Sequence, residues 1–372
     1  MVRKQQLLEA GVTTKNLSPR SEIEKDINLT RKNLSDSNKQ PYFRKIFQKN
    51  AGELLTNISS QLENFTPQPL LNVDGSQTPP RSNGRIITCH IASAAMSGLK
   101  QIEGFLPIKK DHRILYEHDH RGSQIIELRR LNLELITLLE VASKHKDVLV
   151  STDGAIGNIY YKLLEMLQLE RFVTSGSFEI LFEDNLDALN SLLASGRLIG
   201  LTKSTNCRCP EEFIAEELPG VKYLAHNEVL NFLLRPGDLF LEKPNYQVPS
   251  ISSVFDVSIE YFEKLTTLKD LTEKIETHSF MPLSGNQIYT RFQSFKTNHN
   301  NLLQIIKNLD FDRQGASIEP FCQIKSDKEA KSHASFVQSK WNANRYTNSD
   351  DIRDVRFDVA SPTRLVRKNN SS

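Results

Sequence analysis

A histidine, a Ser-Gly-Asn turn and an arginine lie close together in the second half of the sequence. They fall in residues 277–291, and the residues of interest are His278, Ser284, Gly285, Asn286 and Arg291. A Ser-Gly-Asn turn that opens a helix leaves backbone N–H groups free, and the helix dipole adds positive potential, so anions bind there. A histidine beside a bound phosphate can act as a general base toward an attacking hydroxyl. The segment therefore predicts a phosphate site, with His278 and Arg291 as catalytic residues and residues 284–286 holding the phosphate.

Apolar residues on both sides of this segment recur at helical spacing. Before it they are Ile259, Phe262, Leu265, Leu268, Leu271 and Ile275, and after it Ile288, Phe292, Phe295, Leu302, Leu303, Ile305, Ile306 and Leu309. Such a period predicts two amphipathic helices. The sequence therefore predicts a helix–loop–helix with His278 at the mouth of the loop.

Together these features resemble the Fic family, whose motif HPFx(D/E)GNGRxxR lies on a helix–loop–helix. The residues that match its His, Phe, Gly, Asn and final Arg are His278, Phe280, Gly285, Asn286 and Arg291. Ser279 replaces the Pro, no carboxylate precedes the glycine, and Gln287 and Ile288 replace the second Gly and the first Arg. The resemblance implies transfer of AMP from ATP, with Mg²⁺, to a hydroxyl group of a protein substrate.

A second set of residues resembles the ADP-ribosyltransferases. An expected strand at 85–90 ends in His90, a second at 148–152 contains Ser151, and Tyr160 and Glu212 follow. In that family the histidine orients the nicotinamide ribose, and the glutamate stabilises the oxocarbenium-like transition state. This resemblance implies NAD in place of ATP, bound by these four residues.

Cys89 supports a third interpretation. It lies just before an expected helix at 92–103, and a thiolate is favoured at a helix N-terminus. The segment Cys-His-Ile-Ala-Ser is similar to the nucleophile segment of effector glutamine deamidases, which implies a cysteine-dependent hydrolase or deamidase with His226 or His278 as its histidine. A buried structural cysteine is the alternative.

Two pairs of residues have the chemistry of zinc ligands. His118 and His120 lie on one side of an extended segment, and Cys207 and Cys209 form a Cys-x-Cys pair. Zinc sites more often use Cys-x-x-Cys. We therefore expect solvated histidines and predict no protein-bound metal site.

Composition narrows the class of protein. The 372 residues carry a net charge of +2 with 25% charged residues, so no global field favours nucleic acid or a membrane, and we predict neither a nucleic-acid partner nor a membrane span. The four cysteines do not make a disulfide framework. We expect a soluble protein of the cytoplasm, or one delivered to a host cytoplasm without a cleavable signal peptide.

The chain reads as four parts. Residues 1–84 are expected to be a flexible arm and linker, because Asp-Gly, Pro-Pro and Asn-Gly in 72–84 are typical of turns. Residues 85–225 form an α/β region, residues 226–313 a helical region with the helix–loop–helix, and residues 314–372 a flexible tail. The fold class is α+β, a helix-rich globular domain with a small sheet and flexible termini.

Within the α/β region the pattern predicts individual elements. Residues 125–143 and 186–194 have the period of helices, and residues 148–152, 178–182 and 198–201 read as strands. These elements would position the candidate residues of the region.

The sequence thus predicts a transferase that moves a nucleotide-derived group onto a protein hydroxyl. The resemblance also implies a secreted bacterial effector with a host protein as substrate. Three alternatives stay open: an NAD-dependent ADP-ribosyltransferase, a cysteine-dependent hydrolase or deamidase, and a noncatalytic interaction protein.

Overall fold

A computed structural model describes most of the chain and divides it into two compact units. The described residues are 19–78, 81–83, 86–98, 113–117, 122–170, 176–202, 209–242, 259–283, 289–297, 299–313 and 319–343. The first unit comprises Met1–Glu53 and Asn206–Leu234, and the second comprises Leu54–Thr205 and Arg235–Ser372. Among the described residues, no helix is both long and apolar enough to cross a membrane.

The first unit is helical. Its elements are α2 (Pro19–Ser35), α3 (Gln40–Ala51), α8 (Cys209–Glu212), η2 (Pro219–Tyr223) and α9 (His226–Leu233). Two side chains of α3 donate to carbonyls at the end of α9: Gln40 Nε2 to Phe232 O at 2.7 Å and Arg44 Nη1 to Leu233 O at 2.6 Å. The last carbonyls of a helix have no partner within it, so α3 caps α9.

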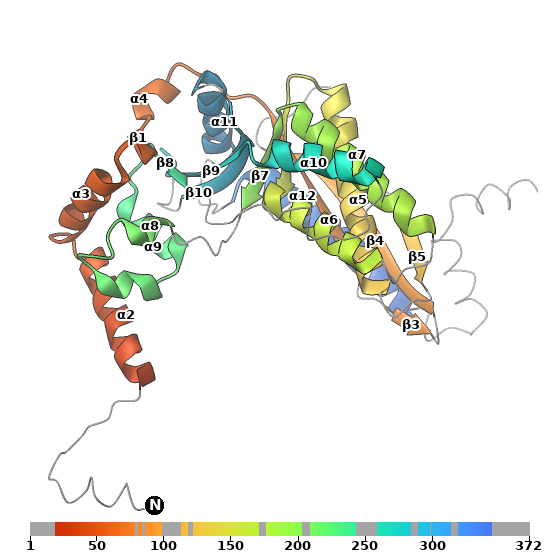
Figure 1. Cartoon of the computed structure of the whole chain (residues 1–372), viewed down its shortest axis with the longest axis horizontal. Helices are drawn as coiled ribbons and strands as arrows, with labels where there is room; N and C mark the ends of the chain where they lie inside the picture. The colour runs from red at the N-terminus through yellow and green to blue at the C-terminus, as the bar shows by residue number, and fades with distance from the viewer. Residues whose placement is uncertain are drawn as a thin grey trace, which may run out of the picture. The chain divides into compact units, whose positions relative to one another are not determined.

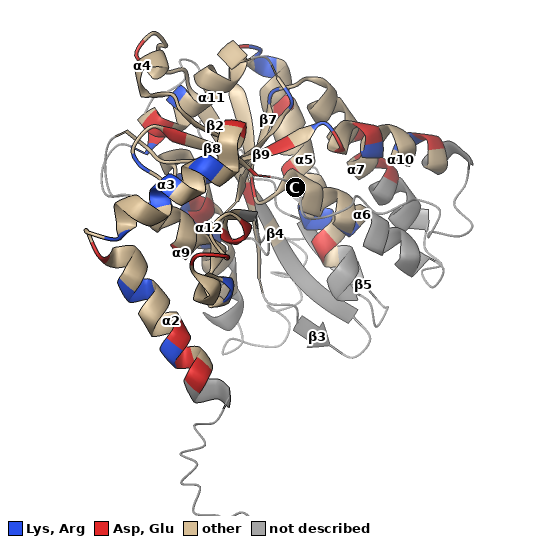
Figure 2. Ribbon diagram, turned by 60° about the vertical axis from the view of Figure 1, so that its left-hand side comes forward, with Lys and Arg blue, Asp and Glu red and all other residues tan. Residues whose placement is uncertain are grey.

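Helix α2 carries both signs of charge along its length (Figure 2). Arg31 Nε lies 2.5 Å from Glu228 Oε1 of α9. A Cβ on Gly220 would lie 2.2 Å from Thr30 Oγ1, so a glycine at that position allows η2 to pack closely on α2.

The second unit is built on a ten-stranded sheet with the order β1-β8-β9-β10-β7-β6-β2-β4-β3, in which β5 pairs with β4 (Figure 1). Its strands are β1 (Leu55–Asn57), β2 (Leu70–Gln77), β3 (Arg81–Asn83), β4 (Ile86–Ser97), β5 (Arg113–Glu117), β6 (Leu149–Asp153), β7 (Leu198–Thr202), β8 (Asp238–Glu242), β9 (Ile275–Phe280) and β10 (Thr290–Phe295). The β2–β6 and β6–β7 pairs are parallel, and the other pairs are antiparallel.

Helices cover both faces of this sheet. They are α4 (Ser59–Leu62), α5 (Gly122–Lys144), α6 (Ile156–Glu170), α7 (Gly176–Ala194), α10 (Ile259–Thr272), α11 (His299–Asp312) and α12 (Phe321–Ala343), and η1 (Gly52–Leu54) precedes β1. Leu71 and Val73 of β2 pack with α5, α6, α7 and α10, whereas Leu70 packs with α4 and α11. Because neighbouring residues of a strand point to opposite faces, the two clusters lie on opposite sides of the sheet.

The predicted class, an α+β chain rich in helices, is confirmed, and its sheet has ten strands. The elements predicted at 125–143, 148–152, 186–194 and 198–201 are present as α5, β6, the end of α7 and β7. Residues 178–182 belong to α7 and are not a strand. Residues 19–78 form α2, α3, α4 and strands that include β2, although the sequence reads as a flexible arm there. The outermost residues, 1–18 and 344–372, lie outside the described part of the chain.

The predicted helix–loop–helix is wrong. The chain runs from α10 into β9, and β10 follows before α11, so two paired strands replace the expected loop and the start of the second helix. Thr277 to Phe280 and Thr290 to Ser294 are buried on both faces. Strands buried on both faces need no alternation of polar and apolar residues, and the scattered apolar residues of these strands imitate a helical period.

The orientation of α5 gives the first testable prediction. Leu135 is fully buried, whereas the neighbouring Ile136 is 39% exposed. We expect Leu135→Ala to lower the free energy of unfolding by about 2–5 kcal/mol, because it loses burial and leaves a cavity, and Ile136→Ala to lower it by less than about 1 kcal/mol. Urea unfolding followed by circular dichroism measures both. Equal losses in the two variants would contradict this orientation of α5.

Candidate active site

Two aspartates lie on neighbouring parallel strands, Asp153 at the carboxyl end of β6 and Asp74 within β2. β2 and β6 pair with Asn72 opposite Ser151, and Asp74 and Asp153 follow two residues later on the same face. Gly154, with φ of 118°, then turns the chain out of the sheet; this is backbone geometry that glycine adopts without strain. The pairing therefore brings the two carboxylates side by side on one face of the sheet, where β6 ends; we call this place the edge of the β2–β6 pair.

Helix α5 supplies a third carboxylate at this edge. A Cβ on Gly75 would lie 2.2 Å from Glu134 Oε1, so the missing side chain of Gly75 makes room for the carboxylate. Arg130, one turn earlier on α5, donates from Nη1 to Glu134 Oε1 at 2.9 Å. Burial raises the pKa of Glu134, and the charge of Arg130 opposes that shift.

Helix α12 packs on β2 and β4 and reaches the same edge with one of its faces. Gln323 Nε2 donates to Asp153 Oδ1 at 2.5 Å, and Ser326 Oγ accepts from Asn72 Nδ2 at 2.5 Å. Asp327 hydrogen-bonds the side chain of Asp74. Residues three or four apart on a helix share a face, so a polar face of α12 follows the polar row of β2 and β6.

Four carboxylates thus form what we call the acidic cluster: Asp74, Glu134, Asp153 and Asp327. Burial first, and then the neighbouring charges of Glu134, Asp153 and Asp327, raise the pKa of Asp74 to about 8, because like charges disfavour ionisation. Within the described residues, no three carboxylate, imidazole or thiol groups already form a set that could hold a metal ion. The structure therefore shows crowded carboxylates and no preformed coordination sphere.

Two similar strand sequences are the signal that identifies this site. They are Leu-Leu-Asn-Val-Asp at 70–74 and Leu-Val-Ser-Thr-Asp at 149–153, each an apolar strand start that ends in an aspartate. Residues 72–84 read as a linker because Asp74-Gly75 is also typical of a turn, and Asp153, directly after the predicted strand at 148–152, was not predicted as a site residue. Nothing in the sequence places Glu134 or Asp327 beside them.

Of the predicted catalytic residues, His278 lies in β9. Its ring stacks on Phe292 with centroids 5.3 Å apart, and its side chain is 3% exposed. Glu276 Oε2 lies 3.6 Å from His278 Nε2, and this interaction lowers the pKa of Glu276. His278 is therefore a buried residue within the sheet and does not lie at the mouth of a loop.

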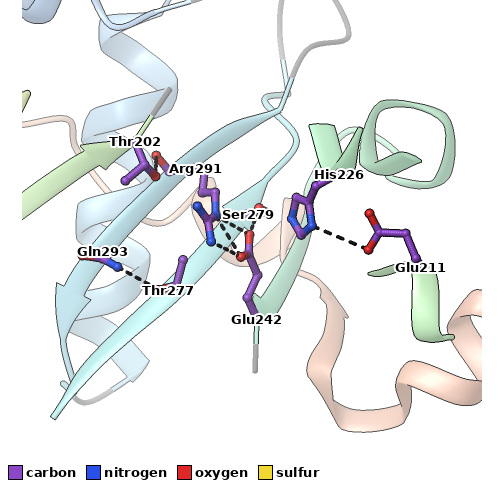
Figure 3. Close-up of polar contacts among 8 residues, drawn as sticks. All are labelled: Thr202, Glu211, His226, Glu242, Thr277, Ser279, Arg291 and Gln293. Atoms are coloured by element: carbon purple, nitrogen blue, oxygen red, sulfur yellow. Dashed lines mark hydrogen bonds and ion pairs between the residues drawn. The ribbon is translucent and has the colours of Figure 1, made fainter. Parts of the chain in front are cut away.

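Arg291, the other predicted catalytic residue, forms a buried ion pair across three strands (Figure 3). Its Nε lies 2.7 and 2.8 Å from the two carboxylate oxygens of Glu242, and its Nη2 lies 2.5 Å from Oε2. Ser279 Oγ donates to Glu242 Oε1 at 2.5 Å. The structure pairs this guanidinium with a carboxylate on β8, where the sequence analysis expected a phosphate.

The remaining predicted residues are scattered or not described. Ser284, Gly285 and Asn286 lie outside the described residues, as do His118, His120 and Cys207, and the side chains of Cys89, His90 and Cys209 are not described. Ser151 is buried and donates to Asn72 Oδ1 at 2.8 Å. Tyr160 is buried in α6, where burial raises its pKa to about 12. Glu212 lies in α8 of the first unit.

His226, the predicted partner of Cys89, belongs to the first unit. Its Nδ1 lies 3.9 Å from Glu211 Oε2 (Figure 3), and both side chains are largely buried. His226 therefore faces a carboxylate of its own unit.

Solved structures with very different sequences share this fold. No protein-family model and no curated protein matches the sequence. The fold is similar to the crystal structure of the NurA nuclease from Sulfolobus solfataricus, with a TM-score of 0.50 and 14% identity over 82% of this chain and 93% of that one. Structures of NurA with manganese (12% identity, TM-score 0.48, 82% and 96% covered) and of NurA bound to dAMP and manganese (12%, 0.45, 73% and 87%) also match.

The likeness overturns the predicted family and function. The fold is similar to that of a solved nuclease structure, so the Fic resemblance is wrong, and so are the ADP-ribosyltransferase and deamidase alternatives; the noncatalytic alternative gains no support. The predictions of ATP or NAD as cofactor, of a protein hydroxyl as substrate and of an effector role are wrong with them. The exclusion of nucleic acid as a partner is wrong on the same finding. Each resemblance rested on a few short motifs. Among the described residues, His278 and Arg291 lie in strands and not in a helix–loop–helix, and Glu212 belongs to a different unit from Ser151 and Tyr160.

The pKa of Asp74 predicts how stability changes with pH. The carboxyl group ionises near 3.8 in an unfolded chain but near 8 in the fold, so between these values unfolding releases a proton. The free energy of unfolding should therefore fall as the pH rises from about 4 to about 8, and Asp74→Asn should remove that part of the slope. Urea unfolding of both proteins across this range, without divalent metal, is the measurement. An identical slope in Asp74→Asn would contradict the crowding of the acidic cluster.

The buried ion pair of β8 and β10 predicts a large loss of stability. Glu242→Gln leaves the Arg291 charge buried without the carboxylate, so we expect the free energy of unfolding to fall by about 3–5 kcal/mol. Glu183→Gln is the matched control, because Glu183 pairs with Lys264 at 2.7 Å but is 39% exposed; it should cost less than about 1 kcal/mol. Urea unfolding of the two variants compares them, and similar losses would show that Arg291 does not depend on Glu242.

Proposed function

We propose that the second unit is a nuclease that hydrolyses phosphodiester bonds of nucleic acid with the help of a divalent cation. The acidic cluster carries the proposal. Two aspartates come from the neighbouring parallel strands β2 and β6, one glutamate comes from α5 and one aspartate from α12, and the pKa of Asp74 is raised to about 8. A strongly shifted pKa in a group of carboxylates is typical of a functional site.

The donor set fits Mn²⁺ or Mg²⁺. Both are hard cations that bind carboxylate oxygens, and a cation would offset the repulsion that raises the pKa of Asp74. Asp74, Glu134 and Asp153 are the carboxylates that would close around it, since no three of the described groups already form a metal-binding set. A bound divalent cation polarises a phosphate oxygen and lowers the pKa of its bound water, which provides a nucleophile at neutral pH.

Other residues keep these carboxylates in place. Arg130 holds Glu134 through its Nη1, and Gln323 holds Asp153 through its Nε2. These bonds limit the rotation of the two carboxylates. Their role is to orient the acidic groups toward the cation.

The similarity to NurA supports the same class of reaction. The Sulfolobus solfataricus protein is a nuclease, and its fold matches 82% of this chain. At 14% identity the likeness concerns the fold, so the chemical argument for a nuclease rests on the acidic cluster. A fold without that cluster would not support the proposal, because one fold serves many functions.

Removal of individual carboxylates tests the proposed function. Asp74→Asn and Asp153→Asn should each lower the rate of Mn²⁺- or Mg²⁺-dependent cleavage of labelled DNA or RNA oligonucleotides by at least about a hundredfold, since each removes a negative charge that holds the cation. Chelation of the metal should abolish cleavage, and adding it back should restore cleavage. Gel assays on single strands and duplexes measure the rates.

Asp187→Asn is the control. Asp187 is an exposed aspartate of α7 that lies 3.4 Å from Lys264 Nζ, so its loss should leave cleavage unchanged. Failure of the wild-type chain to cut any of these oligonucleotides with either metal, or full activity of Asp74→Asn and Asp153→Asn, would refute the proposed function.

A further inference from the structure

Helix α12 places a lysine next to the acidic cluster. Lys331 lies one turn after Asp327, and its Nζ is 2.7 Å from Asp327 Oδ1. Asp327 in turn hydrogen-bonds Asp74. A single carboxylate group therefore separates the ammonium group from the central aspartate of the site.

The register of α12 fixes this arrangement. Gln323 binds Asp153 and Ser326 binds Asn72, so two points before Asp327 hold the helix against β2 and β6. Ala330 and Ala334, which follow on the helix, are buried. Because contacts before and after this turn hold α12 against the sheet, the backbone of Lys331 stays beside the acidic cluster when its side chain moves.

Exposure increases from the acidic cluster to the lysine. Asp74 is buried, the side chain of Asp327 is 27% exposed, and that of Lys331 is 67% exposed. A phosphodiester that approaches the cluster from solvent along α12 therefore meets the ammonium group of Lys331 before it meets Asp74.

Stability does not explain the ion pair of Lys331. Exposed pairs of this kind contribute about 0–1 kcal/mol, so little is lost when the ammonium group leaves Asp327 for another anion. A lysine ammonium is a compact point charge on a flexible stem and is a common phosphate-binding group. Near four carboxylates, such a group would also reduce the repulsion that a phosphate backbone meets.

We propose that Lys331 is a substrate-binding residue that contacts a phosphate of the nucleic-acid strand next to the phosphate to be cleaved. The inference rests on the proposed nuclease function. The strand would cross α12 at Lys331, with one backbone phosphate on the ammonium group and its neighbour at the acidic cluster. Asp327 holds the ammonium group when no strand is bound.

The chain contains a closely matched control for this lysine. Lys144 of α5 pairs with Glu140 at 2.7 Å, also four residues earlier on its helix, and its side chain is 65% exposed. Lys331→Met and Lys144→Met therefore remove the same charge from the same kind of pair. Only the first lies next to the acidic cluster, so a difference between them reports on that location.

The experiment measures binding of a fluorescently labelled oligodeoxynucleotide, single-stranded and duplex, at a series of salt concentrations. An Asp153→Asn background prevents cleavage during the measurement. We expect Lys331→Met to weaken binding by about fivefold and to reduce the slope of log affinity against log salt by about one, because one phosphate contact is lost. Lys331→Arg should keep the contact, and Lys144→Met should match the parent protein.

Two results would overturn the inference: unchanged affinity and salt slope in Lys331→Met, or an equal loss in Lys144→Met. Cleavage by the otherwise wild-type chain separates this failure from that of the proposed function. Suppose the otherwise wild-type chain cuts nucleic acid, but Lys331→Met neither raises KM nor weakens binding. Then only the proposed role of Lys331 is refuted. If the otherwise wild-type chain neither binds nor cuts nucleic acid, both the nuclease proposal and the inference about Lys331 are refuted. Equal melting temperatures of the two Met variants exclude misfolding as the cause of a difference.

Discussion

The candidate active site depends on the parallel pairing of β2 and β6. The pair with Asn72 opposite Ser151 brings Asp74 and Asp153 to the same end and the same face of the sheet. A shift of one residue would turn one of the two aspartates to the opposite face. The polar row also decides what can pack above it. Ser151 donates to Asn72, and Asn72 donates to Ser326, so a polar helix face, and not an apolar one, covers this part of the sheet.

Helices α5 and α12, on opposite faces of the sheet, contribute different kinds of group to the acidic cluster. The apolar side of α5 packs against Leu71 and Val73, and its Glu134 reaches the site through the space that Gly75 leaves open. Helix α12 lies on the other face and contributes Gln323 and Asp327 directly. The sheet edge thus combines a rigid, buried carboxylate from α5 with more exposed groups from α12.

The sheet contains buried carboxylates in two different electrostatic environments. Glu242 is compensated by Arg291 and Ser279, so its charge is matched where it lies. Asp74 has like charges around it and an increased pKa, which is unfavourable unless a proton or a cation neutralises it. Matched charge is typical of a structural element, whereas unmatched charge is typical of a site that binds something. This difference separates Arg291, a predicted catalytic residue, from the residues to which we assign the chemistry.

The sequence by itself determined the elements whose pattern is local. The helix at 125–143 and the strands at 148–152 and 198–201 follow from apolar periodicity, and the structure has them as α5, β6 and β7. Only the tertiary structure decided that residues 275–295 form β9 and β10, because pairing with β8 and β7 outweighs a weak helical period. It alone brought together Asp74, Glu134, Asp153 and Asp327, which are far apart in the chain. The sequence around a carboxylate does not show which charged groups lie near it in space. That depends on which strands pair and which helices cover the sheet.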